Sequence, residues 1–418
     1  MLKQQANPSA FSRPVQRIYR LCASIRTSVL LKAFNHVISS HPALRLRLSE
    51  DKDGWWQYFS DHLPEITGVS IIGKTPNLRA SYASYIISQD ASVPFDLCNN
   101  SPILAKVVTL DGEYYLSLCL DHIAADDLAT DLFEHELSNA YARELLNLPH
   151  PTSQAENLFF AYMERENSQR FREEYNLNYW ITLLRNAPLS PKDGNELSWK
   201  PGMHQRWVIN ESQFKVLNQA CRIQQCSLFT LVLAALTRLI GELGNNDDVI
   251  INIPISNRAL PSDYSLIANL SMLLHLRING ALTSPPSAFL VHVRDKVLGG
   301  MVHRQYDYDA LSNAMIEDAA SRGGRINWMT GCSFIREHRF PVDNDNLLIE
   351  RLDNQPEQNY QIPYGSLVLT CRQSETHLLF MMDWDYSFWQ IGGSTLQTRY
   401  LKILYTLAQI PKINLQNE

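Results

Sequence analysis

The spacing of apolar residues changes from a strand pattern to a helix pattern near the middle of the first half of the chain. Two apolar runs in Ile103–Leu120 flank Asp111-Gly112, a pair typical of a hairpin turn. After them, apolar residues recur every three or four positions, which predicts a helix from about Asp126 to Leu146. His122 therefore lies where a buried strand ends and a helix begins, a position that can present a side chain to a cleft.

The same two patterns predict elements along the rest of the chain. Helices are expected in Arg26–Ile38, Leu158–Leu184, Glu211–Gln224 and Leu231–Leu243. Strands are expected after Pro42 and in Gln205–Ile209 and Val249–Arg258.

A chain of 418 residues is too long for one compact core, which predicts two lobes. Proline and glycine among polar residues mark residues 189–203 as a linker. The expected division is therefore an N-terminal lobe of residues 1–188, this linker, and a C-terminal lobe of residues 204–418.

Composition narrows the class of protein. Apolar residues make up 45% of the chain and charged residues 19%, as in ordinary globular proteins. A net charge of −6 without any basic run argues against a nucleic-acid surface, and no apolar stretch is long enough to span a membrane. The start of the chain lacks the apolar run of a signal peptide, and the 7 scattered cysteines show no metal-ligand spacing, so Cys221 and Cys226 are expected as buried thiols. We therefore expect a cytoplasmic protein.

The histidine at the strand–helix junction belongs to a His-x-x-x-Asp pattern formed by His122 and Asp126. The spacing alone is weak, because about one chance match is expected in a chain of this size. A second match, His303 with Asp307, falls in a stretch that resembles an ordinary amphipathic helix. A buried core histidine is the alternative interpretation of His122; the surrounding strand, turn and helix favour a functional site.

The segment Asp121–Asp127, DHIAADD, resembles the HHxxxDG core of the condensation domains of nonribosomal peptide synthetases, within the chloramphenicol-acetyltransferase-like superfamily. The resemblance implies that His122 is the active-site residue. It also implies that Asp126 is structural and pairs with an arginine from the second half of the chain. Val249–Arg258 resembles the family segment that supplies this arginine, which makes Arg258 the expected partner. An exposed arginine at a strand end is the alternative.

The resemblance extends, more weakly, over most of the chain. Ser40–Leu48 is similar to the family segment with the letters HPALR, and Asn327–Phe334 resembles the strand that crosses between the lobes beside the active site. Ser333 is therefore a candidate substrate-binding residue. The implied fold class is α/β, with two chloramphenicol-acetyltransferase-like lobes in a V-shaped pseudo-dimer and the active site at the lobe interface.

Two positions depart from the family core, since Asp121 replaces the first histidine and Asp127 replaces the glycine. An acid in the first turn of a helix is favoured by the helix dipole, by roughly 0.3–1 kcal/mol. The functional hypothesis is that Asp121 or Asp127 attracts a cationic amine acceptor or raises the pKa of His122. A third interpretation is that a side chain at position 127 blocks the channel and abolishes activity.

The resemblance implies that an acyl thioester is attacked by an amine or a hydroxyl group. A histidine can accept the proton of the nucleophile, or orient the amine and stabilise its developing charge. No bound cofactor or metal is expected, because the phosphopantetheine-linked thioester is already an activated substrate. The implied partners are an acyl or peptidyl carrier protein and a small amine or alcohol, and a monomer suffices.

No carrier or adenylation signature accompanies this region, which favours a stand-alone condensation enzyme of natural-product biosynthesis that forms an amide or ester bond. Two alternatives remain open. One is a coenzyme A-dependent O- or N-acyltransferase of the same superfamily. The other is a catalytically silent homologue that binds carrier proteins.

Overall fold

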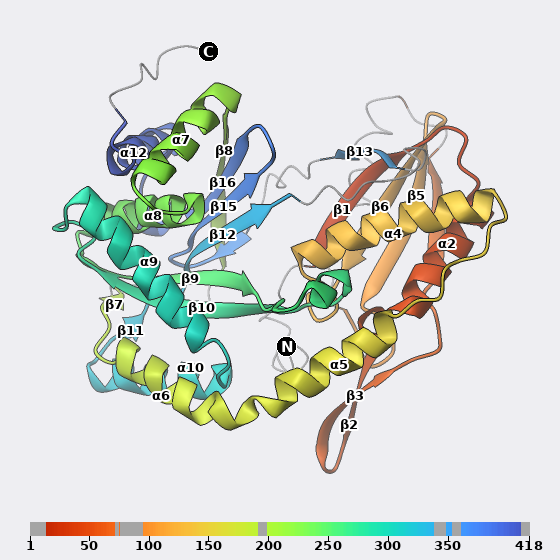
Figure 1. Ribbon diagram of the computed structural model, residues 1–418, viewed down its shortest axis with the longest axis horizontal. Coiled ribbons are helices and arrows are strands. Elements are labelled where there is room, and N and C mark those ends of the chain that lie inside the picture. Colours follow the sequence, from red (N-terminus) through yellow and green to blue (C-terminus); the bar gives the residue numbers. More distant parts are fainter. Residues whose placement is uncertain are drawn as a thin grey trace. The chain divides into compact units, whose positions relative to one another are not determined.

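The computed structural model of the chain describes residues 14–71, 75, 95–190, 199–337, 348–352 and 361–410 (Figure 1). The chain folds into two compact units. The first unit combines the chain up to Asn167 with Asn257–Ser271 and strand β13 (Leu348–Leu352), and most of the remainder forms the second unit. The units thus differ from the contiguous lobes predicted from the sequence, because two segments of the second half pack into the first unit.

The first unit is built on a five-stranded sheet with the order β13-β1-β6-β5-β4. Strands β4 and β5 are parallel, and the other neighbours are antiparallel. Its remaining strands are β1 (Val15–Leu21), β4 (Ile66–Ile71), β5 (Ile103–Leu110) and β6 (Glu113–Leu120), with a separate hairpin of β2 (Leu46–Asp51) and β3 (Gly54–Phe59). Its helices are α2 (Thr27–Ser40), α4 (Asp127–Leu145) and α5 (Ala155–Ser168), with the short 3-10 turns η2 (Pro42–Arg45) and η4 (Pro261–Ser265).

The predicted hairpin and helix around His122 are both confirmed. Asp111 and Gly112 have φ angles of 53° and 84°, which is the left-handed pair that a two-residue turn of type I′ requires. Leucines on alternate positions of β6 face a core that includes residues of α2 and α4. In this core, Phe34 of α2 and Phe133 of α4 meet edge to face, with ring centroids 6.0 Å apart. The β6–α4 junction is therefore attached to a packed core on both of its sides.

Two sequence predictions in the middle of the chain are wrong. The single helix expected over Leu158–Leu184 is broken into α5, a 3-10 turn η3 (Arg170–Arg172) and α6 (Glu173–Leu184). Within these helices the fully buried positions stop at Tyr162 and resume at Asn176, so no apolar stripe supports a continuous helix between them. The linker expected at 189–203 contains β7 (Leu189–Ser190) and the first residues of β8 (Trp199–Ile209); residues 191–198 lie outside the described part.

The second unit contains a seven-stranded sheet with the order β10-β9-β12-β15-β16-β8-β14. Strand β12 is parallel to both β9 and β15, whereas β15, β16, β8 and β14 pair in antiparallel fashion. The strands not yet bounded are β9 (Asp248–Ser256), β10 (Ser271–Asn279), β12 (Thr330–Arg336), β14 (Gln361–Pro363), β15 (Leu367–Gln373) and β16 (Leu378–Asp385), and β11 (Arg325–Ile326) pairs with β7. The helices are α6, α7 (Glu211–Ile223), α8 (Leu228–Gly244), α9 (Pro286–Val302), α10 (Tyr308–Ser321), α11 (Tyr386–Trp389) and α12 (Gly393–Leu407).

Helix α8 is the centre of the second core. Most of its residues are buried, and Ser227 caps its start by accepting a hydrogen bond from the backbone N–H of Thr230 at 3.0 Å. Among the described residues, no single helix is long and apolar enough to cross a membrane; α7 and α8 meet that test only together, as a pair bent by 94°. Beside α8, Cys221 is buried as expected, but Cys226 is only half-buried.

A buried histidine lies in the sheet of the second unit. His275 of β10 donates from Nδ1 to Oδ1 of Asn252 on β9, at 2.5 Å, because that amide oxygen can only accept. The ring meets Trp328 edge to face, with centroids 4.9 Å apart. Burial lowers the pKa of His275 to about 4, so the imidazole is neutral near pH 7.

We expect His275→Gln to reduce the dependence of folding stability on pH. The pKa of His275 falls from an ordinary 6.5 to about 4 on folding, so its contribution is complete above pH 6.5 and is lost as the pH falls toward 4. Between pH 7 and pH 5, the free energy of unfolding should fall by about 2 kcal/mol more in the wild type than in the variant, as measured by urea unfolding. The exposed His62 provides a control, His62→Gln, that should behave as wild type. Equal pH dependence in wild type and His275→Gln would contradict the assignment.

Candidate active site

The residues between β6 and α4 form a tight turn that carries His122. The backbone carbonyl of Asp121 accepts a hydrogen bond from the N–H of Ala124 at 3.0 Å, and its carboxylate accepts one from the N–H of Ile123 at 2.8 Å. Asp121 is buried, and burial raises the pKa of its carboxyl group, an effect that the bond from Ile123 partly offsets. Asp121 therefore shapes the turn, a role that the sequence did not reveal.

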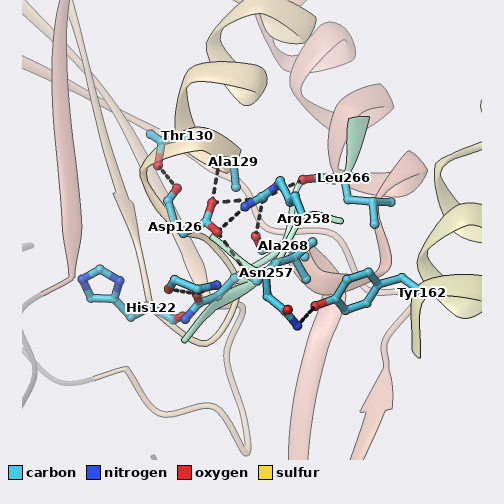
Figure 2. A network of polar contacts seen from close by, with 12 residues as sticks. His122, Asp126, Ala129, Thr130, Tyr162, Asn257, Arg258, Leu266 and Ala268 are labelled. Carbon is cyan, nitrogen blue, oxygen red and sulfur yellow. Dashed lines mark hydrogen bonds and ion pairs between the residues drawn. The ribbon is translucent and has the colours of Figure 1, made fainter. Parts of the chain in front are cut away.

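The His122 side chain is half-buried, and Figure 2 shows its imidazole directed away from Asp126 and Arg258. Within the described part of the chain, no hydrogen bond of this imidazole is found. A buried core histidine normally has its ring nitrogens paired, as His275 does through Nδ1. His122 therefore differs in its surroundings from the buried His275, and its functional role stays a prediction.

Asp126 is the N-cap residue of α4, and its carboxylate accepts four hydrogen bonds (Figure 2). The N–H of Ala129 donates to Oδ1 at 2.9 Å, and the N–H of Leu270 donates to Oδ2 at 3.1 Å. Arg258 donates from Nη1 to Oδ2 at 2.6 Å and from Nη2 to Oδ1 at 3.1 Å, which is the two-pronged geometry typical of strong arginine–carboxylate pairs. The pair predicted between Asp126 and Arg258 is therefore present, and the alternative of an exposed Arg258 is wrong.

Arg258 is almost completely enclosed, with 1% of its side chain exposed. Its Nη2 also donates to the carbonyl oxygens of Leu266 and Ala268, at 3.3 Å and 3.1 Å. The guanidinium therefore connects the cap of α4 to the backbone of the segment Asn257–Ser271, to which Arg258 itself belongs. This segment lies in the first unit, with His122 and Asp126.

The segment Asn257–Ser271 is in turn bound to helix α5. Asn257 donates from Nδ2 to the hydroxyl of Tyr162 at 2.9 Å and to Oε2 of Glu166 at 2.7 Å. Arg165 donates to Oδ2 of the buried Asp263 at 2.7 Å. The same oxygen accepts the N–H groups of Ala259 and Leu260 at 2.9 Å and 2.8 Å.

These anchoring residues were missed in the sequence. Only Asp263 had a local signal, because Pro261 followed two residues later by an acid is typical of the start of a short helical turn. The side chains on α5 and their partners lie more than 90 positions apart, as the pairs Tyr162–Asn257 and Arg165–Asp263 show. No local pattern of one sequence indicates such contacts.

Asp127, at the position of the family's glycine, has a partner that the sequence did not predict. Arg17 of β1 donates from Nη2 to Oδ1 of Asp127 at 2.6 Å. The Arg17 side chain is 10% exposed and that of Asp127 is 41% exposed, so the pair lies at the surface of the first unit. The charge of Asp127 is therefore partly compensated within the protein.

The remaining candidate, Ser333, lies on β12 in the second unit and is half-buried. Its role in substrate binding stays a prediction. In the part of the chain that the structure describes, no group of three or more His, Cys, Asp or Glu side chains is arranged to hold a metal ion.

Arg258→Met should destabilise the protein by about 3–5 kcal/mol, because it leaves the Asp126 carboxylate buried without a cation. The measurement is urea unfolding at pH 7. Arg258→Met combined with Asp126→Asn should cost less than the sum of the two single changes, since both remove the same pair. The exposed pair of Arg294 with Asp295 supplies a control, and Arg294→Met should cost at most about 0.5 kcal/mol. A cost for Arg258→Met as small as that of the control would show that the pair does not constrain the turn.

Proteins of similar sequence and structure identify the family of this chain. The sequence profile of the family described as "Condensation domain" matches residues 3–329. The bassianolide nonribosomal cyclodepsipeptide synthetase of Beauveria bassiana is 25% identical over 363 residues, which are 81% of this chain and 11% of that protein. The curated relatives are far longer, and the chain spans only 1% of the cyclosporin synthetase of Tolypocladium inflatum and 11% of the bassianolide synthetase.

Solved structures have the same fold over nearly the whole chain. The first condensation domain of the calcium-dependent antibiotic synthetase, in complex with a substrate analogue, aligns with a TM-score of 0.70 and 17% identity over 98% of this chain and 93% of that one. A variant of the starter condensation domain of rhizomide synthetase, in complex with C8-CoA, aligns with a TM-score of 0.72 and 16% identity over 98% and 92%. These similarities confirm the predicted α/β fold class. Because the family profile covers more than three quarters of the sequence, the chain belongs to the condensation-domain family.

Proposed function

We propose that the chain joins an acyl thioester to an amine or hydroxyl acceptor, with His122 as the catalytic residue. The family forms amide and ester bonds on carrier-bound thioesters. The observation that carries the proposal for this chain is the buried pair of Asp126 with Arg258, which fixes the turn that holds the His122 imidazole. The donor would be carried on the phosphopantetheine arm of an acyl or peptidyl carrier protein.

In this mechanism the nucleophilic nitrogen or oxygen attacks the thioester carbonyl carbon, while the His122 imidazole accepts its proton or orients it. A tetrahedral oxyanion forms. Its collapse breaks the carbon–sulfur bond, and the carrier thiol leaves as the thiolate and takes up a proton. The new bond is an amide when the acceptor is an amine and an ester when it is an alcohol.

A second candidate donor is an acyl-coenzyme A. The observation that favours it is that a solved relative of the same fold is in complex with C8-CoA. This donor ends in the same phosphopantetheine thiol, so the proposed chemistry is unchanged. The two donors differ in whether a carrier protein must dock.

Three acidic or polar residues are proposed to influence the acceptor. Asp127 is exposed enough to attract a cationic amine, although Arg17 compensates part of its charge. Asp121 is buried and bonded to Ile123, so its influence would act through the shape of the turn. Ser333 is proposed to contact substrate from β12.

The test of the proposed function is a product assay by mass spectrometry. A panel of acyl groups, on a carrier protein and on coenzyme A, is offered to pooled amines and alcohols. We expect a new amide or ester with wild type and at least a 100-fold lower rate with His122→Ala, as is typical for the loss of a proton-transfer group. His62→Ala controls for the loss of a histidine at an exposed position.

The assay also separates the alternatives. Product from acyl-coenzyme A alone would favour the coenzyme A-dependent acyltransferase. No product from any donor, together with carrier binding that is unchanged in His122→Ala, would contradict catalysis and favour the silent carrier-binding homologue.

Asp127→Asn should raise the KM for a cationic amine acceptor by about two- to fivefold and leave the KM for a neutral alcohol unchanged. The effect is small because the carboxylate is 41% exposed and is paired with Arg17, so its attraction is screened. Steady-state kinetics with the two acceptors measure it. An equal change for both acceptors would mean that Asp127 acts only on the start of α4.

A further inference from the structure

Two consecutive residues of the segment Asn257–Ser271 hold the turn that carries His122. Asn269 donates from Nδ2 to the backbone carbonyl of His122. Leu270 donates from its N–H to the Asp126 carboxylate at 3.1 Å. The stretch from His122 to Asp126 is therefore held at both ends by two neighbouring residues, Asn269 and Leu270. The sequence indicated a long-range partner only for Asp126.

The amide of Asn269 can adopt one orientation only. Its Oδ1 accepts hydrogen bonds from the N–H of Ser271 at 3.1 Å and from the Ser271 hydroxyl at 2.5 Å. A backbone N–H can only donate and a carbonyl oxygen can only accept, so Oδ1 must face Ser271 and Nδ2 must face His122. An aspartate at this position would place a carboxylate oxygen against the carbonyl oxygen of His122.

We infer that Asn269 is a positioning residue for the reaction, which sets the backbone of His122 and thereby the direction of its imidazole. The inference rests on the proposed catalytic role of His122. The carbonyl group held by Asn269 belongs to the same residue as the imidazole, so the bond restrains the ψ angle of His122 and the position of the Cα atom from which the imidazole projects. Misplacement of a reacting group by about 1 Å costs on the order of 100-fold in rate, and a half-buried amide with both ends paired restrains that rotation.

The test compares Asn269→Asp with Asn279→Asp. Asn279 is exposed at the other end of β10, about 26 Å along the strand from Ser271, so the control adds the same charge beyond the screening distance of about 8 Å. The first measurement is NMR of histidine ring resonances in labelled protein, with the His122 signals assigned from His122→Ala. We expect Asn269→Asp to move the His122 signals and Asn279→Asp to leave them in place.

The second measurement is steady-state kinetics. Asn269→Asp should lower kcat by about 10- to 100-fold with KM changed by less than about twofold, because the imidazole is misdirected while the substrate contacts remain. Asn269→Ala, which removes the bond without adding a charge, should give a smaller loss of kcat in the same direction. Urea unfolding of each variant verifies that the compared proteins are folded.

Unmoved His122 signals in both folded Asn269 variants would overturn the inference. So would a kcat equal to that of Asn279→Asp, because the bond would then be only structural. If wild type forms no product, the proposed function fails, and the NMR comparison decides the positioning role by itself: movement of the His122 signals supports it and their constancy overturns it.

Discussion

An ionised carboxylate taken out of water is stable only where hydrogen bonds and an opposite charge replace its hydration. Asp126 meets this requirement with two backbone N–H groups and the two-pronged guanidinium of Arg258. Its oxygens thus receive donors from α4 and from a segment more than 130 residues away in the sequence. The start of α4 and the turn before it therefore cannot keep their geometry unless that distant segment is in place.

The second His-x-x-x-Asp pattern of the chain shows why the motif alone is insufficient. Asp307 caps α10 by accepting the N–H of Ala310 at 3.0 Å, much as Asp126 accepts that of Ala129 at 2.9 Å. His303, however, ends α9, stacks on Tyr179 with ring centroids 3.8 Å apart and is paired with Asn176 at 3.0 Å. The stretch predicted as one amphipathic helix is thus the junction of two helices. Both aspartates are helix caps, and the difference lies in the arginine bound to Asp126 and in the surroundings of the two imidazoles.

Elements that depend only on residues close together in the sequence were predicted correctly from local patterns. The turn at Asp111-Gly112, the leucines of β6 and the apolar spacing of α4 each depend on neighbours within a few residues, so their periodicity was readable. Arg258 was predicted from the resemblance to a family, since a strand-end arginine has no periodicity of its own. The single helix predicted over Leu158–Leu184 is in fact two helices, α5 and α6. The residues between them have a composition that favours helix, but none of them is buried, so no packing supports one continuous helix.

The two departures from the family core are tied into the fold rather than left as isolated charges. Asp121 accepts the N–H of Ile123 within the turn, and Asp127 binds Arg17 beside the positive end of α4. Each acid therefore has a local physical reason to be there that is independent of substrate. A carboxylate that stabilises the turn can coexist with a reactive histidine, so neither acid by itself indicates a gain or a loss of activity. Under the proposed function, activity depends instead on whether the backbone of His122, held by the segment that also supplies Arg258, directs the imidazole toward the substrate.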